Sequence, residues 1–572
     1  MVKIKKLALL VGLGSFAFHV LAEELPLGDV STNPVSNMFS YRGYLREYLS
    51  VNLDDNIVGP SGQMTGKGEL SMARTVLRLD GAAKLNEKLS FVGTVRVVRE
   101  VRTDYMKDLD KAAAQSSVFS GFYNKEKYNE NELREGYFVL KPTQNISLKL
   151  GRQQVAWGET DFLRGTDIVH GFDYRWRSLL ESENEELRTP LVMANAEIYF
   201  PKVDGTLQLL YRPGWDKGAD VVNKRDLFGG RWAGQPNKGI NNLDAAPYNY
   251  HHSEGDTKDA NWGFRWSSKF SDTSYSLMYY KGLSLDPVVN SIAMSAPGSP
   301  GSPLTSVPVY MAGSIVNSQS YGSAPANGFL ESIFPRIETI GATLNTYFEK
   351  VDGVVRGELA YVPNQPFNVG SRFNAIVGAP ITIGAIPGLD TLSPGCAPPP
   401  GAPCLTFPTV VLPGAGGIIK KHVMNTMVGF DKTLPLQNIF GTSRPSTFSV
   451  QLFDTWITNF DEKDDIVDLF SYGAKKKRHS TTLSSVLINN YRYDTINVGL
   501  AVIYDVTWGD TVLIPSIEFA PGDKWRFRVE GDFTFAKNSD IKTRGGQVED
   551  STHPLSTGKN NDQLYFRATY QF

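Results

Sequence analysis

The chain has 572 residues, a formal net charge of −2 at pH 7 and 11% aromatic residues. This balanced charge gives no argument for a nucleic-acid partner, and beyond the first 22 residues no apolar stretch reaches the ~20 residues that a membrane helix needs. The chain is therefore either a soluble protein or a membrane protein built from strands. Its 25 tyrosines and 31 phenylalanines favour strands.

The beginning of the chain has the order of a secretory signal peptide. Three lysines among the first six residues form a positive start, and an apolar stretch too short to span a bilayer follows them. Val20 and Ala22 then stand at the −3 and −1 positions of a cleavage site. We expect residues 1–22 to be removed after secretion through the inner membrane and residues 23–572 to form a single domain.

Apolar and polar residues alternate with a period of two along much of the remaining chain. In residues 525–535, for example, Trp525 and Phe527 fall on one face, and Arg526 and Arg528 fall on the other. This alternation predicts strands with one apolar and one polar face. Candidate strands lie at residues 39–52, 69–83, 89–102, 133–141, 146–156, 193–200, 205–212, 261–270, 274–283, 337–349, 353–363, 419–432, 446–458, 479–491, 495–506, 510–519, 524–536 and 562–572.

These candidates make eighteen strands, and we expect sixteen to eighteen in the folded chain. An even number keeps both ends of a barrel on the periplasmic side of the outer membrane. Segment 479–491 is included on this ground, because without it the turn at 520–524 would face outward. The last strand would then run in the wrong direction.

Short turns alternate with long polar connections between the candidate strands. A compact soluble domain rarely carries several structureless loops of such length, whereas a transmembrane barrel has tight periplasmic turns and long outer loops. The sequence therefore predicts an all-β fold, a transmembrane antiparallel β-barrel, with a secreted β-sandwich as the alternative. The short turns lie at 85–88, 142–145, 201–205, 271–274, 351–353 and 520–524, and the long connections near 105–132, 157–192, 213–260, 284–335 and 364–418.

The last candidate strand ends on an aromatic residue, Phe572, and its apolar face is continuous. This ending resembles the closing strand of outer-membrane proteins, which in that class is the signal read by the barrel-assembly machinery. Because hydrocarbon offers no hydrogen-bond partner to an open sheet edge, the last strand must pair with the first. The apolar face consists of Leu564, Phe566, Ala568, Tyr570 and Phe572.

The only two cysteines, Cys396 and Cys404, lie in the stretch GCAPPPGAPC. In an oxidising compartment this spacing predicts one local disulfide that closes a proline-rich loop. A metal site is the alternative, but no histidine or second cysteine pair lies close by in the sequence.

The stretch LKLGRQQVAWGETDFLRGTDIV at 148–169 is the most distinctive part of the chain. It resembles the outer-membrane family called "domain of unknown function 1302". The resemblance implies a porin-like barrel associated with export or uptake of hydrophobic compounds and lipids, alongside periplasmic lipoproteins and large inner-membrane exporters. The matching residues are Gly151, Arg152, Gln153, Trp157, Gly158 and Glu159.

Arg152 raises a problem in this stretch, because it follows Leu148 and Leu150 on the face directed toward lipid. An arginine at mid-bilayer costs ~2–4 kcal/mol on that face. A β-bulge at Gly151 would reverse the alternation and turn Arg152 and Gln154 into the lumen, with Val155 and Trp157 toward lipid. The alternative is that the strand has already left the membrane at Arg152.

The connection at 157–192 is dense in charge and is the third long outer loop. We interpret it as an inward-folded constriction of the kind formed by the third loop of general porins, with a solvated outer loop as the alternative. It contains the acidic residues Glu159, Asp161, Asp167, Asp173, Glu181, Glu183, Glu185 and Glu186 and the arginines Arg164, Arg175, Arg177 and Arg188.

The polar faces of five strands that are consecutive around a closed barrel carry nine arginines and four carboxylates. The positive excess of five predicts a basic pore wall that enriches anions opposite the acidic loop. Glu47 breaks the pattern, since it falls on the apolar face, and the alternative is a register slip at this point of the first strand. The arginines are Arg42, Arg46, Arg74, Arg78, Arg96, Arg102, Arg526, Arg528 and Arg567, and the carboxylates are Asp80, Glu100, Glu530 and Asp532.

No motif of a serine hydrolase, a zinc protease or a phosphate-binding loop occurs in the sequence, so we expect no enzyme, no catalytic residue and no cofactor. His251 and His252 lie near Asp256 and Asp259 in a long loop, where we interpret them as solvated, with metal binding as the alternative. We expect an outer-membrane channel or transport conduit for small or amphipathic organic solutes. The alternatives are an outer-membrane component of a lipid or hydrophobic-compound transport system and a plugged structural barrel whose outer loops bind a partner.

Overall fold

A computed structural model describes residues 38–58, 63–116, 128–160, 163–177, 180–181, 183–225, 230–232, 248–291, 330–370, 414, 417–469, 474–537, 543–544, 547–548 and 553–572. The expected signal peptide at 1–22, the acidic residue Asp161 and the cysteines Cys396 and Cys404 lie outside these residues.

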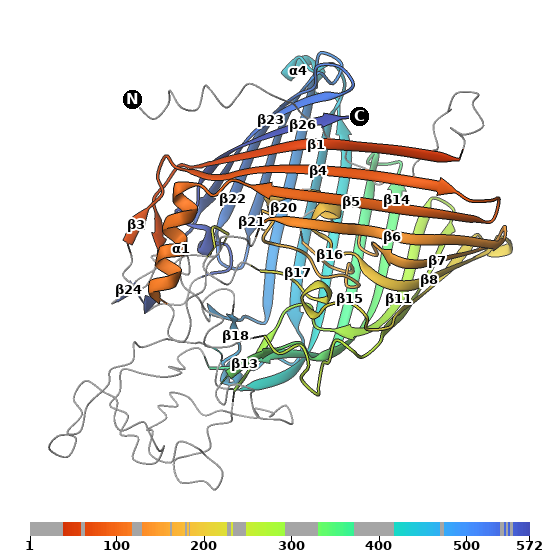
Figure 1. The fold of residues 1–572 in the computed structure, drawn as a ribbon, viewed down its shortest axis with the longest axis horizontal. Helices are drawn as coiled ribbons and strands as arrows, with labels where there is room; N and C mark the ends of the chain where they lie inside the picture. Colours follow the sequence, from red (N-terminus) through yellow and green to blue (C-terminus); the bar gives the residue numbers. More distant parts are fainter. Residues whose placement is uncertain are drawn as a thin grey trace, which may run out of the picture.

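Eighteen antiparallel strands form one closed sheet (Figure 1). The first strand pairs with the second strand of the sheet on one side and with the last strand on the other, so the barrel has no open edge. The strands are β1 (Phe39–Asn52), β4 (Leu70–Lys84), β5 (Leu89–Glu100), β6 (Glu130–Thr143), β7 (Ile146–Gln153), β8 (Leu191–Phe200), β9 (Gly205–Arg212), β10 (Asn261–Phe270), β11 (Thr273–Leu283), β14 (Arg336–Phe348), β15 (Gly353–Asn368), β16 (Ile418–Leu434), β17 (Ser446–Ile457), β20 (His479–Tyr491), β21 (Ile496–Asp505), β22 (Thr511–Phe519), β23 (Trp525–Phe535) and β26 (Gln563–Gln571).

The predicted barrel of eighteen strands is confirmed, and each candidate segment overlaps one strand of the sheet. The segment at 479–491, which was included to give an even number of strands, is β20 and pairs with β17 and β21. In the closing pair of β1 and β26, Leu45 lies opposite Tyr570 and Leu49 opposite Phe566.

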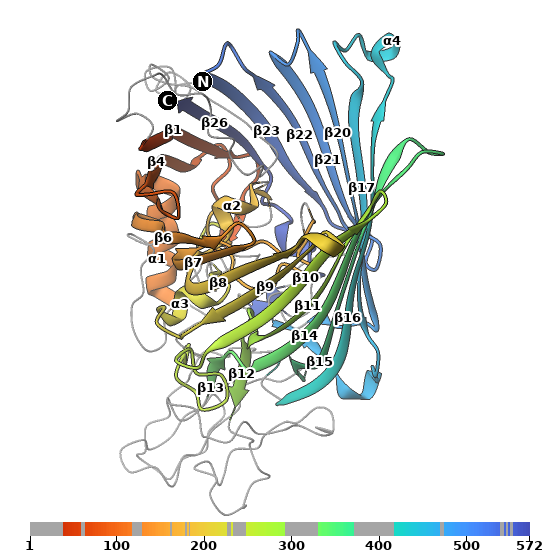
Figure 2. The ribbon, with the colours of Figure 1, turned by 90° about the vertical axis from the view of Figure 1, so that its right-hand side faces the viewer.

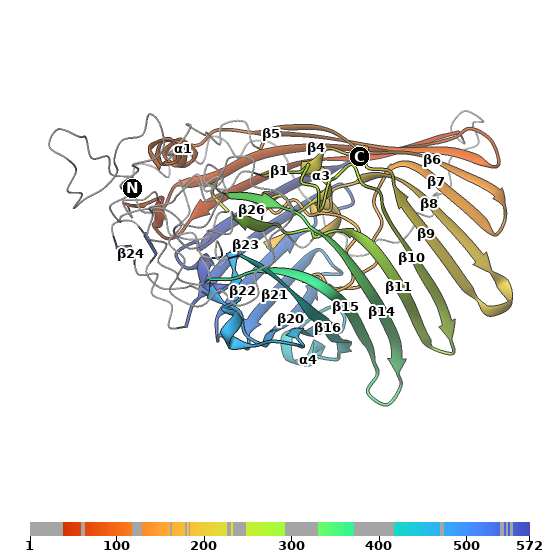
Figure 3. The ribbon, with the colours of Figure 1, turned by 90° about the horizontal axis from the view of Figure 1, so that it is seen from below.

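Long connections gather at one end of the barrel and tight turns at the other (Figure 3). No helix in the described part of the chain is long and apolar enough to cross a membrane. The long connections carry three helices, α1 (Asp104–Ser116), α2 (Asn184–Leu187) and α3 (Gly218–Val221). They also carry two-stranded pairs: β2 (Asn56–Val58) with β3 (Gln63–Thr65), β12 (Val288–Ser291) with β13 (Leu330–Ile333), β18 (Val467–Asp468) with β19 (Ala474–Lys475) and β24 (Thr543–Arg544) with β25 (Gln547–Val548). Helix α4 (Gln437–Phe440) joins β16 to β17 at the turn end.

The outer face of the barrel is apolar because strand residues alternate in direction. Leu79 and Val95 are 41% and 43% exposed on the outside, whereas their neighbours Arg78 and Arg96 are buried on the inside. This arrangement suits hydrocarbon, which offers backbone groups no hydrogen-bond partners and therefore requires a closed sheet with an apolar exterior.

Glu47 is an exception on the outer face of β1. The register between β1 and β4 runs without a shift from Phe39 to Ser50 and pairs Glu47 with Thr75. The Thr75 hydroxyl donates a hydrogen bond of 2.6 Å to Glu47 Oε2, so both side chains lie on the face that carries Leu45. The register slip considered from the sequence does not occur here, and the carboxylate has a hydroxyl partner within the sheet instead.

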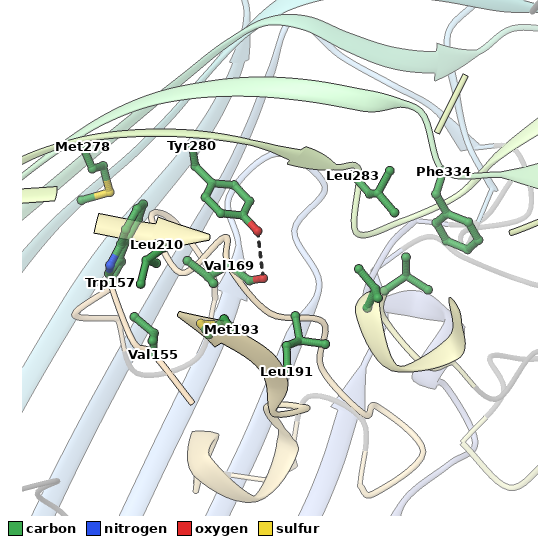
Figure 4. Close-up of a cluster of buried hydrophobic side chains, with 12 residues drawn as sticks. Val155, Trp157, Val169, Leu191, Met193, Leu210, Met278, Tyr280, Leu283 and Phe334 are labelled. Carbon is green, nitrogen blue, oxygen red and sulfur yellow. Dashed lines mark hydrogen bonds between the residues drawn. The ribbon is translucent and has the colours of Figure 1, made fainter. Parts of the chain in front are cut away.

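The apolar core lies inside the barrel, where connections pack on the inward faces of the strands. One cluster joins Trp157 and Val169 to Leu210 and Tyr280 of the wall, and the Tyr280 hydroxyl donates to the Val169 carbonyl at 3.5 Å (Figure 4). A second cluster joins inward residues of β1, β4, β5 and β26 to the connection between β7 and β8; its members are Tyr48, Met72, Val76, Val98, Phe172, Tyr174, Trp176, Leu187 and Tyr565.

Candidate functional site

The connection between β7 and β8 folds into the barrel, and we call residues 154–190 the inner loop. Its helix α2 lies within the ring of strands (Figure 2). The motif GRQQVAWGE begins in β7 and continues into the inner loop, so its residues determine where the chain enters the lumen.

The predicted bulge at Gly151 is wrong. Both neighbours of β7 pair regularly through Gly151 and Arg152, and Arg152 continues on the outward face at the end of the strand. Its guanidinium binds Asp216 at 3.1 Å and donates to the Pro190 carbonyl at 2.8 Å. Arg152 therefore lies outside the sheet at the loop end of the barrel, where an acidic partner from the next long connection compensates its charge.

Gly151 serves a different purpose, since its φ is 134°, a backbone conformation that residues with a side chain rarely adopt. A Cβ atom there would stand 2.3 Å from the Gly136 carbonyl oxygen on β6. The glycine thus permits a close approach of the two strands just before the chain leaves the sheet.

A bulge does occur on the neighbouring strand, at Arg134 of β6. The register between β5 and β6 shifts between Thr94 and Val95, and Arg134 has no Cα partner on β5. Its buried guanidinium points inward, where it donates to the backbone carbonyls of Glu185 and, at 2.8 Å, of Arg188. The bulge therefore adds an inward arginine that holds the end of the inner loop.

Trp157 lies inside the barrel, and the prediction that it faces lipid is wrong. Its side chain is fully buried, and the indole nitrogen donates to Gln208 Oε1 on β9 at 2.7 Å. The sheet ends at Gln153, so the alternation that would have turned Trp157 outward no longer applies. Gln154 lies at the loop base, where its backbone amide donates to Glu135 Oε1 at 2.8 Å.

His170 joins the two ends of the inner loop. The Val155 amide donates to His170 Nε2 at 2.9 Å, which makes Nδ1 the protonated nitrogen, and Nδ1 donates to the Thr189 carbonyl at 2.9 Å. Burial, together with the nearby Arg188 guanidinium, lowers the pKa of His170 to about 3. The imidazole is therefore neutral and holds both ends of the loop together.

Glutamates of the inner loop bind inward arginines of β1, β4, β5 and β26. Glu183 accepts from Arg46 at 2.9 Å and from Arg567 at 2.7 Å. Glu186 accepts from Arg78 at 2.8 Å and from Arg96 at 3.2 Å, and the Tyr44 hydroxyl donates to it at 2.7 Å. Glu185 also binds Arg78. We call this set of contacts the arginine anchor.

These charge pairs control the protonation of the loop glutamates. Burial alone would raise the pKa of Glu186, but Arg78, Arg134 and Arg96 outweigh it and hold that pKa well below its usual range. Burial likewise opposes ionisation of Glu183, and Arg46 and Arg567 lower its pKa. Both carboxylates therefore stay ionised at neutral pH.

A second contact fixes the inner loop to β23. Arg177 Nη2 lies 2.6 Å from Glu530 Oε1 and 3.1 Å from Asp532 Oδ2, and its guanidinium stacks 3.6 Å above the centre of the Tyr565 ring. All four side chains are buried. We call these residues the β23 clamp.

The inner loop also reaches the opposite wall through Glu358 of β15. Glu358 Oε2 accepts from the Thr166 amide at 2.8 Å and from its hydroxyl at 2.9 Å, and Oε1 accepts from the Glu159 amide. Arg356 of the same strand donates to the Glu159 carbonyl at 2.6 Å. In the strand order, β15 stands nine steps from β4 in either direction. The inner loop therefore crosses the lumen between opposite walls.

The nine arginines of the predicted basic wall are placed unevenly with respect to the inner loop. Arg46, Arg78, Arg96 and Arg567 belong to the arginine anchor, whereas Arg74 pairs with Glu100 at 2.9 Å. The other four lie elsewhere: Arg42 is exposed and 3.5 Å from Asp80, Arg102 pairs with Asp110 of α1, Arg528 donates to Glu530 at 2.7 Å, and Arg526 is half-buried on β23. The anchor arginines thus hold the loop and do not face an open passage.

Two members of the site were missed from the sequence. Arg134 would share the outward face of Phe138 if the alternation ran unbroken along β6, and the bulge turns it inward. Glu358 stands on the polar face of GVVRGELAY, so the inward direction was readable, but nothing local indicates which loop it binds. In the described residues, no group of three or more histidine, cysteine, aspartate or glutamate side chains is arranged to hold a metal ion.

A family model described as "Protein of unknown function (DUF1302)" matches residues 64–571. No curated protein matches the chain. Among solved structures, OccAB1 of Acinetobacter baumannii is 8% identical, with a TM-score of 0.42 and coverage of 93% of this chain and 96% of that chain. OpdK of Pseudomonas aeruginosa, solved with vanillate, is 9% identical, with a TM-score of 0.41 and coverage of 93% and 98%. OmpF of Salmonella typhi, in complex with daunomycin, is 8% identical, with a TM-score of 0.38 and coverage of 93% and 97%.

Proposed function

The chain belongs to the DUF1302 family of proteins of unknown function, and we propose that it is an outer-membrane conduit for small or amphipathic organic solutes. In this proposal the inner loop sets the width of the passage. The closed sheet with an apolar exterior supports the location, because that architecture is the one by which strands cross an outer membrane.

One observation carries the proposal: the inner loop spans the lumen and is fixed at both walls. The arginine anchor holds it to β1, β4, β5 and β26, and Glu358 holds it to β15. A segment held in this way narrows the lumen without filling the whole cross-section of an eighteen-stranded barrel, whose diameter grows with strand number. The space beside the loop is then the route for solutes.

The charge pairing bears on selectivity. The positive excess on the wall is opposed by Glu183, Glu185 and Glu186, which lie within hydrogen-bond distance of the anchor arginines. Paired charges create a weaker field along a passage than free ones. We therefore expect weak ion selectivity in the intact protein, in place of the anion preference that the wall alone would give.

A plugged barrel is the second candidate, and a specific packing favours it. The connection that follows β9 lies on the inner loop: the Lys224 carbonyl accepts from the Tyr174 amide at 2.9 Å, and Asn223 Oδ1 accepts from the Phe172 amide at 2.9 Å. Two connections are therefore layered in the lumen. A periplasmic lipoprotein or an inner-membrane exporter as partner belongs to the remaining alternative, an outer-membrane component of a lipid or hydrophobic-compound transport system.

Swelling of liposomes that contain the refolded protein separates the two candidates. Neutral sugars of increasing size are added outside, and the rate of swelling reports their entry. A conduit predicts fast entry of small sugars and a cut-off at larger size, with a reversal potential near zero across a salt gradient in planar bilayers. A folded barrel that admits no sugar of any size would reject the conduit in favour of the plugged barrel.

A further inference from the structure

Pro515 stands in the middle of β22, inside the closed wall. Proline has no amide hydrogen, so within sheets it is confined to edges, first positions and bulges. The register between β22 and β23 pairs Leu513 with Phe533 and resumes with Ser516 and Glu530. The two pairs between them, which would include Pro515 opposite Gly531, are missing, whereas Pro515 still lies opposite Leu500 on β21. We call this interruption the β22–β23 seam.

An interruption at this depth is costly in a membrane. Hydrocarbon offers no water to backbone groups that lose their ladder partner, so each such group costs free energy. A soluble sheet would tolerate the same proline at an edge, but this barrel has no edge. The seam is therefore the part of the β22–β23 pair that separates most easily.

Apolar side chains lie on the inner side of the seam. Ile503, Val512 and Ile514 form a buried cluster, and Leu180 of the inner loop packs against it. On the outer side, Gly531 presents no side chain, and a Cβ atom there would stand 2.5 Å from the Phe533 ring. Apolar side chains thus line the inner side of the seam, and the Phe533 ring covers Gly531 on its outer side.

The β23 clamp lies at the same level as the seam. Glu530 and Asp532, which flank Gly531 in the sequence, both bind Arg177 of the inner loop. The inner loop therefore holds β23 by the residues on either side of the interruption. Arg177 thus connects the inner loop to β23 on both sides of Gly531.

We propose that the β22–β23 seam is a lateral exit through which the apolar tail of an amphipathic acid or similar solute passes from the lumen into the bilayer. The inference rests on the proposed conduit and names one class of its solutes. A solute with the same polar head group and no apolar tail would stay in the lumen and take the axial route beside the inner loop.

The test restores the missing donor with Pro515→Val. The protein is reconstituted in vesicles with a lipopolysaccharide outer leaflet, and two probes are followed: a fluorescent dodecanoate entering the membrane and arabinose entering the interior. The variant should slow dodecanoate transfer about five-fold, the factor that one hydrogen bond contributes. Arabinose entry should not change. Equal rates of dodecanoate transfer in wild type and Pro515→Val, or an equal loss for both probes, would overturn the seam.

Pro366→Val is the matched control, because Pro366 lies near the loop end of β15 and keeps its register partner Lys420 on β16. It should leave both probes at wild-type rates, and a slowing equal to that of Pro515→Val would also overturn the proposal. Hydrogen exchange of residues 525–535 gives a second readout that does not depend on transport, and it should slow in Pro515→Val alone. If arabinose enters but Pro515→Val does not change dodecanoate transfer, the proposed conduit stands and only the lateral exit is rejected. If neither probe enters with the wild-type protein, the conduit itself is rejected.

Discussion

Glu186 offers the sharpest test of how the inner loop is held. Its carboxylate binds Arg78, Arg96 and the Tyr44 hydroxyl, and its side chain is 2% exposed. Glu186→Gln keeps the size of the side chain and removes its charge. Two buried guanidinium groups then lose a carboxylate that they share, while Asp80 still pairs with Arg78 and Glu132 with Arg96. Removal of one partner of a buried ion pair is strongly destabilising.

The expected size of the effect follows from burial. Removal of one partner of a buried ion pair costs about 3–5 kcal/mol, which corresponds to about a hundred- to several-thousand-fold in the population of the released loop. Glu185 is the matched control, because it stands next in the sequence, binds Arg78 and has a side chain that is 50% exposed. Glu185→Gln should cost less than about 1 kcal/mol.

Hydrogen exchange of the refolded barrel in detergent micelles measures both variants. The amides of Arg188 and Thr189 donate within the loop, to the carbonyls of Asn184 and Gly171, and report its release directly. Their protection should fall by the factor given above in Glu186→Gln and by less than about five-fold in Glu185→Gln. Equal losses in the two variants, or no loss in either, would refute the arginine anchor as the device that holds the loop.

Three further predictions concern the loop base and the wall. The pKa of His170 is lowered to about 3 from an ordinary ~6.5, so the stability that its neutral ring gives the loop base is complete above about pH 6.5. That stability falls by about 1.4 kcal/mol for each pH unit below about 6.5. Hydrogen exchange of the loop amides, corrected for its intrinsic rate, should therefore rise as the pH falls from about 6.5 to 5 in wild type and not in His170→Gln. Gly151→Ala should lower the unfolding temperature seen by gel mobility, because its Cβ would meet the Gly136 carbonyl and a φ of 134° alone costs a residue with a side chain about 1–3 kcal/mol. Glu47→Leu should stabilise the barrel by about 1 kcal/mol in urea titrations, because it removes a carboxylate from the lipid-facing surface.

Each of these predictions has a control on the same structure. For Gly151→Ala it is Gly81→Ala, since a Cβ at Gly81 would meet no atom closer than 3.9 Å. For Glu47→Leu it is Thr75→Val, which removes the hydroxyl partner and should destabilise the barrel. A rise in stability in Thr75→Val, or unchanged unfolding in Gly151→Ala, would contradict the reasoning from those contacts.

The strands could be predicted because the alternation of β-strand residues is local and leaves a mark on every second position. Even β20, which parity supplied, has its bounds within the predicted segment. The bulge could not be placed correctly, because Gly151 looks like a bulge residue in the sequence while Arg134 has no distinctive neighbour. Its position depends on the register of β5 against β6, which is set by the whole barrel.

The sequence predicts which charged side chains of the candidate site point inward, and it does not predict which of them form ion pairs. Alternation places Arg46, Arg78 and Arg96 inward from the sequence alone. Which carboxylates meet them depends on the path of the inner loop, and that path is decided by contacts such as Glu358 with Thr166, which lie 192 residues apart in the chain. Sequence reasoning therefore gave a basic wall and an acidic loop, and the structure adds that the two are bound to each other.

The central claim is that the inner loop constricts the passage, and the conductance and reversal potential of single channels in planar bilayers test it most directly. The wild type is compared with a variant in which a glycine–serine linker replaces residues 160–186. The inner loop as constriction predicts small steps and weak selectivity in wild type. It predicts severalfold larger, anion-selective steps in the variant, because the anchor arginines then face the lumen without their glutamates. The same conductance and selectivity in both proteins would contradict the account.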